Sequence, residues 1–146
     1  PSNLLNLLVV PSALAPMNQV TSLSDLETNF PLQIGNKLYR VVNKHVNWYK
    51  AAHNCRQKGG NLLNIESAVE MDAILAVIPI DRYWMSANCL AGNREFISLA
   101  TGEAMSYSRW DTGEPNNLTG DEFCGEFDRT AFNDNSCFRL RKYICE

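Results

Sequence analysis

A cluster of oxygen-bearing side chains between residues 114 and 134 has the composition of a cation site. Hard cations such as calcium bind about six to eight oxygen atoms from carboxylates, amides and water. Three carboxylates and two amides in this window could supply such ligands: Glu114, Asn116, Glu122, Asn133 and Asp134. One calcium ion would reduce their formal charge from −3 to −1. A solvated acidic loop would have the same composition, and the spacing differs from that of an EF-hand.

Pro115 separates two of these candidate ligands. Proline fixes its own φ angle, and the peptide bond before it can be cis. A cis bond here would direct the side chains of Glu114 and Asn116 to the same side, where one ion could bind both. An ordinary turn proline is the alternative for this tripeptide taken alone.

Two helices are predicted in the first half of the chain. Asn47 is a favourable N-cap for a helix over about residues 48–58, and the two glycines that follow would end it. Ser67 and Glu70 have the spacing of a capping box, in which each side chain satisfies the other's backbone N–H. They predict the start of a second helix, and Pro79 ends it.

Short strands and one polar loop are predicted in the rest of the chain. Residues 31–42 predict two strands around a Gly-Asn turn. After the second helix, short apolar runs alternate with turns at 83–85, 96–99, 104–107, 123–127 and 138–144. A polar stretch lies between residues 109 and 121, and a long ordered loop inside a domain is usually functional. The predicted fold class is α+β.

Length and composition predict a single domain with an N-terminal extension. The chain has 146 residues, of which 45% are hydrophobic and 20% charged, as in soluble globular proteins. Residues 1–29 are interpreted as an extension that docks on the domain or on a second subunit, with the end of a signal peptide as the alternative for its apolar start. Residues 30–146 form the predicted domain. No apolar run predicts a membrane span, and no basic run predicts nucleic-acid binding.

Five cysteines indicate an oxidising compartment: Cys55, Cys89, Cys124, Cys137 and Cys145. The chain has no C-x-x-C pair, and its two histidines lie far from the late cysteines, so the spacing of a zinc site is absent. Two disulfides and one odd cysteine fit better, and they predict a secreted, extracellular protein.

The order and spacing of several motifs resemble those of a C-type lectin domain, over roughly residues 30–146. In chain order they are Trp48-x-x-Ala51-x-x-x-Cys55, Glu114-Pro115-Asn116, Glu122 two residues before Cys124, Asn133-Asp134 shortly before Cys137, and the closing Cys145. Each motif is weak alone, but together they are specific. The tripeptide is the form that mannose-type members of the family use.

The resemblance implies a C-type lectin-like fold of two helices, antiparallel strands and a long calcium-binding loop. It also implies two disulfides, Cys55–Cys145 and Cys124–Cys137. In such lectins two neighbouring sugar hydroxyls bind the calcium ion and hydrogen-bond to its ligands. The resemblance therefore assigns both calcium and sugar binding to the same five residues: Glu114, Asn116, Glu122, Asn133 and Asp134.

The order Glu then Asn implies a preference for mannose-, fucose- or N-acetylglucosamine-type sugars, as in the recognition of microbial or cell-surface glycans in innate immunity. Galactose-type members resemble Gln-Pro-Asp instead and usually have a nearby aromatic residue. The residues after the tripeptide here include no aromatic platform. Leu118 and Asn135 are predicted to flank the bound sugar ring.

Several departures from the family pattern lead to further predictions. Many relatives hold a second calcium ion with acidic residues at the positions of Asn117 and Phe123, so this chain is predicted to bind one ion. Asn117 also begins an N-glycosylation sequon on the rim of the site. Cys89 is left over, either as a buried free thiol or as a disulfide to a second subunit in a homodimer.

Two other classes of function are possible for a chain with these motifs. A module of the same fold could bind a protein and no sugar. The presence of all five candidate calcium-binding residues favours sugar binding over this alternative. An enzyme is disfavoured because no Ser/His/Asp arrangement is evident and because His45 and His53 both lie near the first predicted helix. The chain is therefore predicted to be a binding protein.

Overall fold

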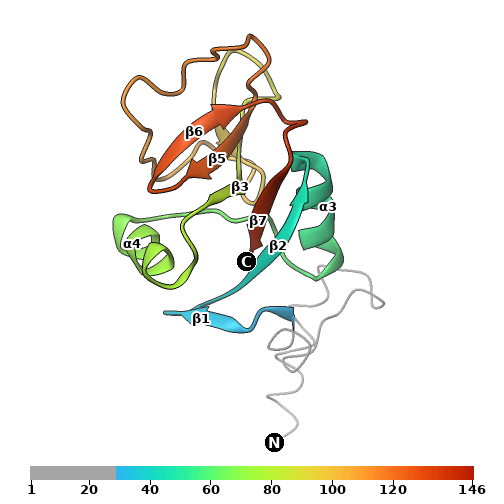
Figure 1. Ribbon diagram of the computed structural model, residues 1–146, viewed down its shortest axis with the longest axis vertical. Helices are drawn as coiled ribbons and strands as arrows, with labels where there is room; N and C mark the ends of the chain where they lie inside the picture. Colours follow the sequence, from blue (N-terminus) through green and yellow to red (C-terminus); the bar gives the residue numbers. More distant parts are fainter. Residues whose placement is uncertain (1–28) are drawn as a thin grey trace, which may run out of the picture.

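The computed structural model describes residues 29–146 (Figure 1). The predicted extension, residues 1–29, lies outside this range except for its last residue. The side-chain amide of Asn29 donates to the carbonyl of Lys58 over 3.3 Å. The elements are β1 Leu32–Ile34, β2 Lys37–Val46, α3 Trp48–Gln57, α4 Ala68–Val77, β3 Arg82–Asn88, β4 Ile97–Ser98, β5 Cys124–Asp128, β6 Ala131–Asn135 and β7 Arg141–Cys145. The predicted α+β class is confirmed.

The seven strands form one sheet in the order β1-β2-β7-β3-β5-β6, with β4 paired to β3. β3 and β7 run parallel, while the other paired strands run antiparallel. The β5–β6 hairpin and the long connection from β4 to β5 lie together at one end of the molecule (Figure 1). No helix within residues 29–146 is long and apolar enough to cross a bilayer.

Both predicted helices form, and both are capped by the predicted residues. The side chain of Asn47 accepts a hydrogen bond from the backbone nitrogen of Lys50 over 2.8 Å, which satisfies a donor of the first turn of α3. Ser67 caps α4 in the same way through the nitrogen of Glu70, at 3.1 Å. The Glu70 carboxylate bonds to the nitrogen of Glu66 and not to that of Ser67, so the capping box is shifted by one residue.

One predicted strand is absent, and one strand of the sheet was not predicted. Residues 104–107 form no strand, and Ala104 makes only an isolated bridge to Ile97. β6 was not predicted, because its sequence, Ala-Phe-Asn-Asp-Asn, contains three polar residues. It is a strand because each of its residues pairs with β5, from Cys124 opposite Asn135 to Asp128 opposite Ala131. The missed strand carries two of the candidate metal ligands.

Two apolar clusters and two disulfides hold the sheet and helices together. One cluster includes Met71 and Ile74 of α4, and the other includes Trp48, Ala51 and Cys55 of α3. Buried apolar area of this kind is the main stabilising term in folding. Cys55–Cys145 links α3 to β7, and Cys124–Cys137 links β5 to the segment after β6. Both implied disulfides are thus present.

Candidate functional site

The long connection between β4 and β5 is fixed to β6 just before the candidate ligands. The backbone nitrogen of Phe132 donates to the carbonyl of Arg109 over 2.7 Å, and the nitrogen of Asp111 donates to the carbonyl of Phe132 over 2.9 Å. The ring of Trp110 meets that of Phe132 edge-on, with centroids 6.0 Å apart. This attachment places the loop that begins at residue 111 beside Asn133 and Asp134.

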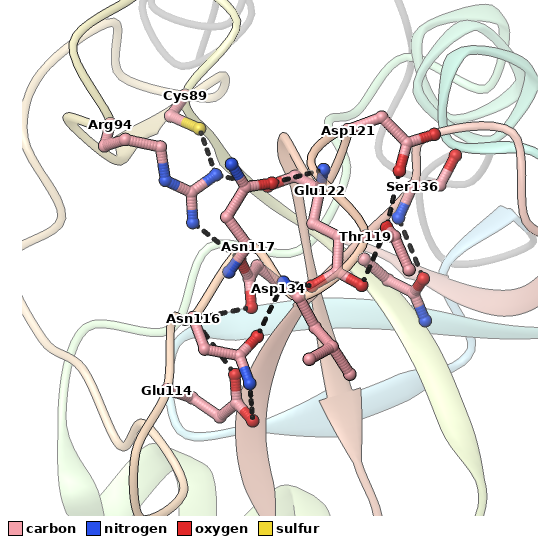
Figure 2. Close-up of polar contacts among 12 residues, drawn as sticks. Cys89, Arg94, Glu114, Asn116, Asn117, Thr119, Asp121, Glu122, Asp134 and Ser136 are labelled. Atoms are coloured by element: carbon pink, nitrogen blue, oxygen red, sulfur yellow. Dashed lines mark hydrogen bonds and ion pairs between the residues drawn. The ribbon is translucent and has the colours of Figure 1, made fainter.

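Glu114 and Asn116 lie on the same side of the loop, as the sequence predicted for a cis proline bond. The Glu114–Pro115 bond is cis. The Glu114 carboxylate accepts hydrogen bonds from the backbone nitrogen of Asn116 over 3.1 Å and from its side-chain amide over 3.3 Å. One carboxylate and one amide of the tripeptide are therefore adjacent (Figure 2).

Asp134 joins this tripeptide to the sheet. Its side chain is fully buried. Its Oδ1 accepts from the backbone nitrogen of Asn116 over 3.2 Å, and its Oδ2 accepts from that of Asn117 over 2.8 Å. The loop thus closes onto a strand residue that lies 17 and 18 positions later in the chain.

Glu122 closes the same loop from its other end. Its carboxylate accepts from the backbone nitrogen of Leu118 over 3.0 Å and from the hydroxyl of Thr119 over 3.2 Å. Its own backbone nitrogen donates to the side-chain oxygen of Asn117 over 3.0 Å. Figure 2 shows these contacts, which bring Glu122 toward Asp134 and the tripeptide.

The three acidic side chains of the site influence one another electrostatically. Partial burial raises the pKa of Glu114, and the neighbouring carboxylates of Asp134 and Glu122 raise it further. Like charges held this close destabilise one another, and a bound cation would relieve their repulsion. The composition of the donor set, with carboxylate and amide oxygens only, fits a hard cation such as calcium.

The acidic groups alone do not form a metal site. Within residues 29–146, no three histidine, cysteine, aspartate or glutamate side chains are grouped closely enough to hold an ion. The carboxylates here accept hydrogen bonds from the loop amides. A cation would therefore need the amide oxygens of Asn116 and Asn133 as well. Asn133 lies on β6 opposite Glu126, and in the described part of the chain no hydrogen bond joins its side chain to the other four.

The two residues predicted to flank a sugar are in different environments. Leu118 is 79% exposed on the loop. Asn135 is half-buried, and its side-chain amide donates to Glu126 over 2.9 Å. Burial raises the pKa of the Glu126 carboxyl, while nearby Arg141 and Asn135 oppose that rise. Asn135 is thus engaged with the sheet, whereas Leu118 is free to contact a ligand.

Sequence reasoning missed Arg94, which contacts the centre of the site. Its guanidinium lies 2.5 Å from Oδ2 of Asp134 and 2.5 Å from the backbone carbonyl of Glu122. It also lies 3.4 Å from the sulfur of Cys89 (Figure 2). The available signal was weak: Arg94 is the single lysine or arginine between residues 83 and 108.

Cys89 is a buried free thiol. Burial raises the pKa of its thiol, against the opposing effect of the Arg94 charge. Within the single chain the residue is 2% exposed, so a disulfide to a second subunit would require its sulfur to reach the surface. The choice between the free thiol and that disulfide stays a prediction.

Comparison with known proteins gives the family. Residues 44–146 match the family model described as the lectin C-type domain. The chain belongs to the C-type lectin family. It is 36% identical over 128 residues to "C-type lectin 37Db" of Drosophila melanogaster, a match that covers 84% of this chain and 85% of that protein.

Solved C-type lectin domains share the fold. The carbohydrate-recognition domain of cow CD23, solved in the presence of a GlcNAc2Man3 oligosaccharide, has a TM-score of 0.73 and 26% identity, covering 78% of this chain and 89% of that one. A calcium-independent type II antifreeze protein has a TM-score of 0.68 and 21% identity, covering 78% and 88%. The predicted C-type lectin fold is confirmed. Its family is one of binding proteins, and no enzyme family is indicated.

Proposed function

We propose that this C-type lectin domain binds one calcium ion and, through it, sugars of the mannose, fucose or N-acetylglucosamine type. The observation that carries this proposal is the adjacency of Glu114 and Asn116 beside Asp134 and Glu122. Because these side chains come from both ends of one loop and from β6, a single ion can reach carboxylates and amides together.

Two of the candidate ligands, Glu114 and Asn116, also contact the sugar directly. A carboxylate oxygen of Glu114 accepts a hydrogen bond from one sugar hydroxyl, while the side-chain NH₂ of Asn116 donates to its neighbour. The calcium ion supplies a strong positive charge that binds both hydroxyl oxygens. The order of acceptor and donor along the tripeptide matches neighbouring equatorial hydroxyls, and exposed Leu118 offers an apolar contact for the ring.

We propose one calcium ion and not two because of the residues at the two positions where many relatives have acidic ligands for a second ion. Asn117 already uses its side-chain oxygen to hold the backbone nitrogen of Glu122. The side chain of Phe123 carries no oxygen that could bind a second ion. The name of the Drosophila relative and the oligosaccharide in the CD23 structure support a sugar ligand. The two disulfides support secretion, because disulfides persist in oxidising compartments.

A binding assay on immobilised mannose tests the proposal. We expect the protein to bind in calcium, to elute with a chelator, and to be displaced by free mannose more readily than by galactose. Glu114→Ala should abolish binding, whereas Asp72→Asn, which changes an exposed acid outside the site, should not. Retention on the mannose resin after complete chelation would contradict the proposal.

A protein ligand is the second candidate, and one surface feature favours it. Phe138 is 71% exposed and lies with its ring centroid 5.6 Å from that of exposed Tyr49. Aromatic residues are enriched in protein interfaces relative to the rest of the surface. If this function holds, glycan arrays in calcium should be blank, and Phe138→Ser should weaken a partner's binding while Glu114→Ala leaves it unchanged.

A further inference from the structure

We propose that Arg94 is a permanent cation of the calcium site, which positions Asp134 and Glu122 and completes the charge balance of a site for one metal ion. This inference rests on the proposed calcium binding. Arg94 is a positioning residue in this scheme, because it contacts the candidate ligands and acts through them.

The contacts of Arg94 connect three separate segments of the chain. One guanidinium nitrogen pairs with Oδ2 of Asp134 on β6, and another donates to the carbonyl of Glu122 and to the sulfur of Cys89. Its guanidinium also lies over the ring of Phe96, with its carbon 5.2 Å from the ring centroid. A planar guanidinium presents several donors in fixed directions, so it can hold these groups simultaneously where an ammonium could not.

The backbone before this side chain has an uncommon conformation. Asn93 and Arg94 have φ angles of 59° and 55°, in the left-handed region that non-glycine residues rarely adopt. The turn that contains both residues is closed by a hydrogen bond of 3.3 Å from the nitrogen of Glu95 to the carbonyl of Gly92. Unfavourable backbone conformations that persist often mark functional positions. Here the turn directs Arg94 toward the site.

The positive charge of Arg94 balances the single negative charge that the five candidate ligands would retain after binding one calcium ion. The five candidate ligands carry −3, and calcium would reduce this to −1. The adjacent guanidinium, whose side chain is 33% exposed, brings the site to neutrality. Without calcium, the same positive charge reduces the repulsion among Glu114, Glu122 and Asp134. It thereby lowers the electrostatic cost of holding these carboxylates on one loop and its neighbouring strand.

The distribution of oxygens on Asp134 leaves room for the metal. Arg94 and the backbone nitrogen of Asn117 both contact Oδ2. Oδ1 accepts from the nitrogen of Asn116 and faces the tripeptide. Arg94 therefore fixes one oxygen of the carboxylate, while the other remains beside Glu114 and Asn116. Partners that orient a metal ligand in this way commonly change metal affinity by about 10- to 100-fold when removed.

Calcium titration of Arg94→Met and Arg94→Lys tests this role. The matched control is Arg129→Met, because Arg129 is also in the left-handed region, at φ 66°, and pairs with Asp128 over 3.2 Å. We expect the calcium dissociation constant to rise about tenfold in Arg94→Met, rise less in Arg94→Lys, and stay within twofold in the control. If Arg94 acted only by repelling calcium, its removal would instead tighten binding.

Hydrogen exchange in the calcium-free proteins gives a second readout. The backbone amides of Asn116 and Asn117 both donate to Asp134, so Arg94→Met should exchange them about tenfold faster than the wild type. If the wild type binds one calcium ion, and Arg94→Met changes neither the exchange rates nor the calcium affinity, the role of Arg94 is overturned while the proposed function stands. A wild type that takes up no calcium at millimolar concentration would overturn the proposed function and this role with it.

Discussion

The buried carboxylate of Asp134 lies 2.8 Å from the backbone nitrogen of Asn117 and so joins β6 to the loop that carries the candidate tripeptide. This contact links a rigid element of the sheet to a segment with few apolar side chains. The loop is therefore ordered by polar contacts, and its shape depends on the charge of one carboxylate.

Asp134→Asn should remove calcium-dependent sugar binding and lower the free energy of unfolding by about 2 kcal/mol, because it weakens hydrogen bonds to a charged acceptor and leaves Arg94 unpaired. Calcium titration and urea unfolding measure the two effects. Asp121→Asn is the control, since Asp121 is an exposed acid of the same loop. Equal losses in both variants would contradict a specific role for Asp134.

Exchanging the donor and acceptor of the tripeptide should change sugar preference. In Glu114→Gln combined with Asn116→Asp, we expect mannose to compete less well than in the wild type, relative to galactose, while calcium is still bound. The reason is that the acceptor and the donor for the two sugar hydroxyls change places. Competition assays with free monosaccharides give the ratio. An unchanged ratio would exclude hydroxyl order as the basis of selectivity.

Acid should destabilise the contact between β2 and α4. Burial alone would raise the pKa of the Glu70 carboxyl. Hydrogen bonds from Tyr39 and Lys37 outweigh this effect and hold the pKa below its usual value. A carboxyl with a lowered folded-state pKa stabilises the protein above its unfolded pKa of about 4.3, and this contribution is lost as the pH falls through the folded-state pKa.

Glu70→Gln should therefore be less stable than the wild type at pH 7, by on the order of 1–2 kcal/mol. The difference should shrink as the pH falls below about 4. Urea unfolding at pH 7, 5 and 3 measures this. Glu66→Gln is a suitable control, because Glu66 also pairs with Lys37 but is largely exposed. A difference between Glu70→Gln and the wild type that grows toward acid would contradict the assignment.

Gly60 should not tolerate a side chain. A β-carbon there would clash with the carbonyl of Glu146 and lie 2.6 Å from the ring of Phe30. We expect Gly60→Ala to lower the free energy of unfolding by about 3 kcal/mol. Gly35→Ala adds only the strain of a positive φ and should cost about 1 kcal/mol, since nothing lies near it. Thermal and urea unfolding of both variants give the comparison.

The sequence predicted the features of this fold that depend on interactions between residues close together in the chain. Asn47 and Ser67 begin helices because their side chains satisfy nearby backbone donors, and this depends only on the next three residues. Cys124 and Cys137 required the family resemblance, because cysteine positions alone do not give their pairing. The candidate ligands stand out by their oxygen-bearing side chains, but their assignment to one site also required the resemblance, because they are spread over 21 positions, from residue 114 to residue 134.

The features that escaped prediction depend on contacts between distant segments. Arg94 lies 28 residues from Glu122 and 40 from Asp134, and no local pattern indicates that a lone arginine will reach both. β6 was missed because its strand character comes from pairing with β5 and not from alternating apolar residues. The bond from the amide of Asn135 to Glu126, which is buried in the sheet, also joins separate strands, while the contact of Asn135 with a sugar stays a prediction.

The separation of the binding loop from the core makes this domain suitable for directed evolution. Neither apolar cluster includes any residue from 111 to 122, so substitutions on the exposed part of this loop leave the apolar core unchanged. If the proposed sugar binding holds, libraries that randomise the exposed positions 118 and 119, while keeping Glu114, Asn116, Glu122 and Asp134, would sample new specificities on the same fold. Natural divergence of glycan recognition among such domains can proceed in the same way, by loop exchange without loss of foldability.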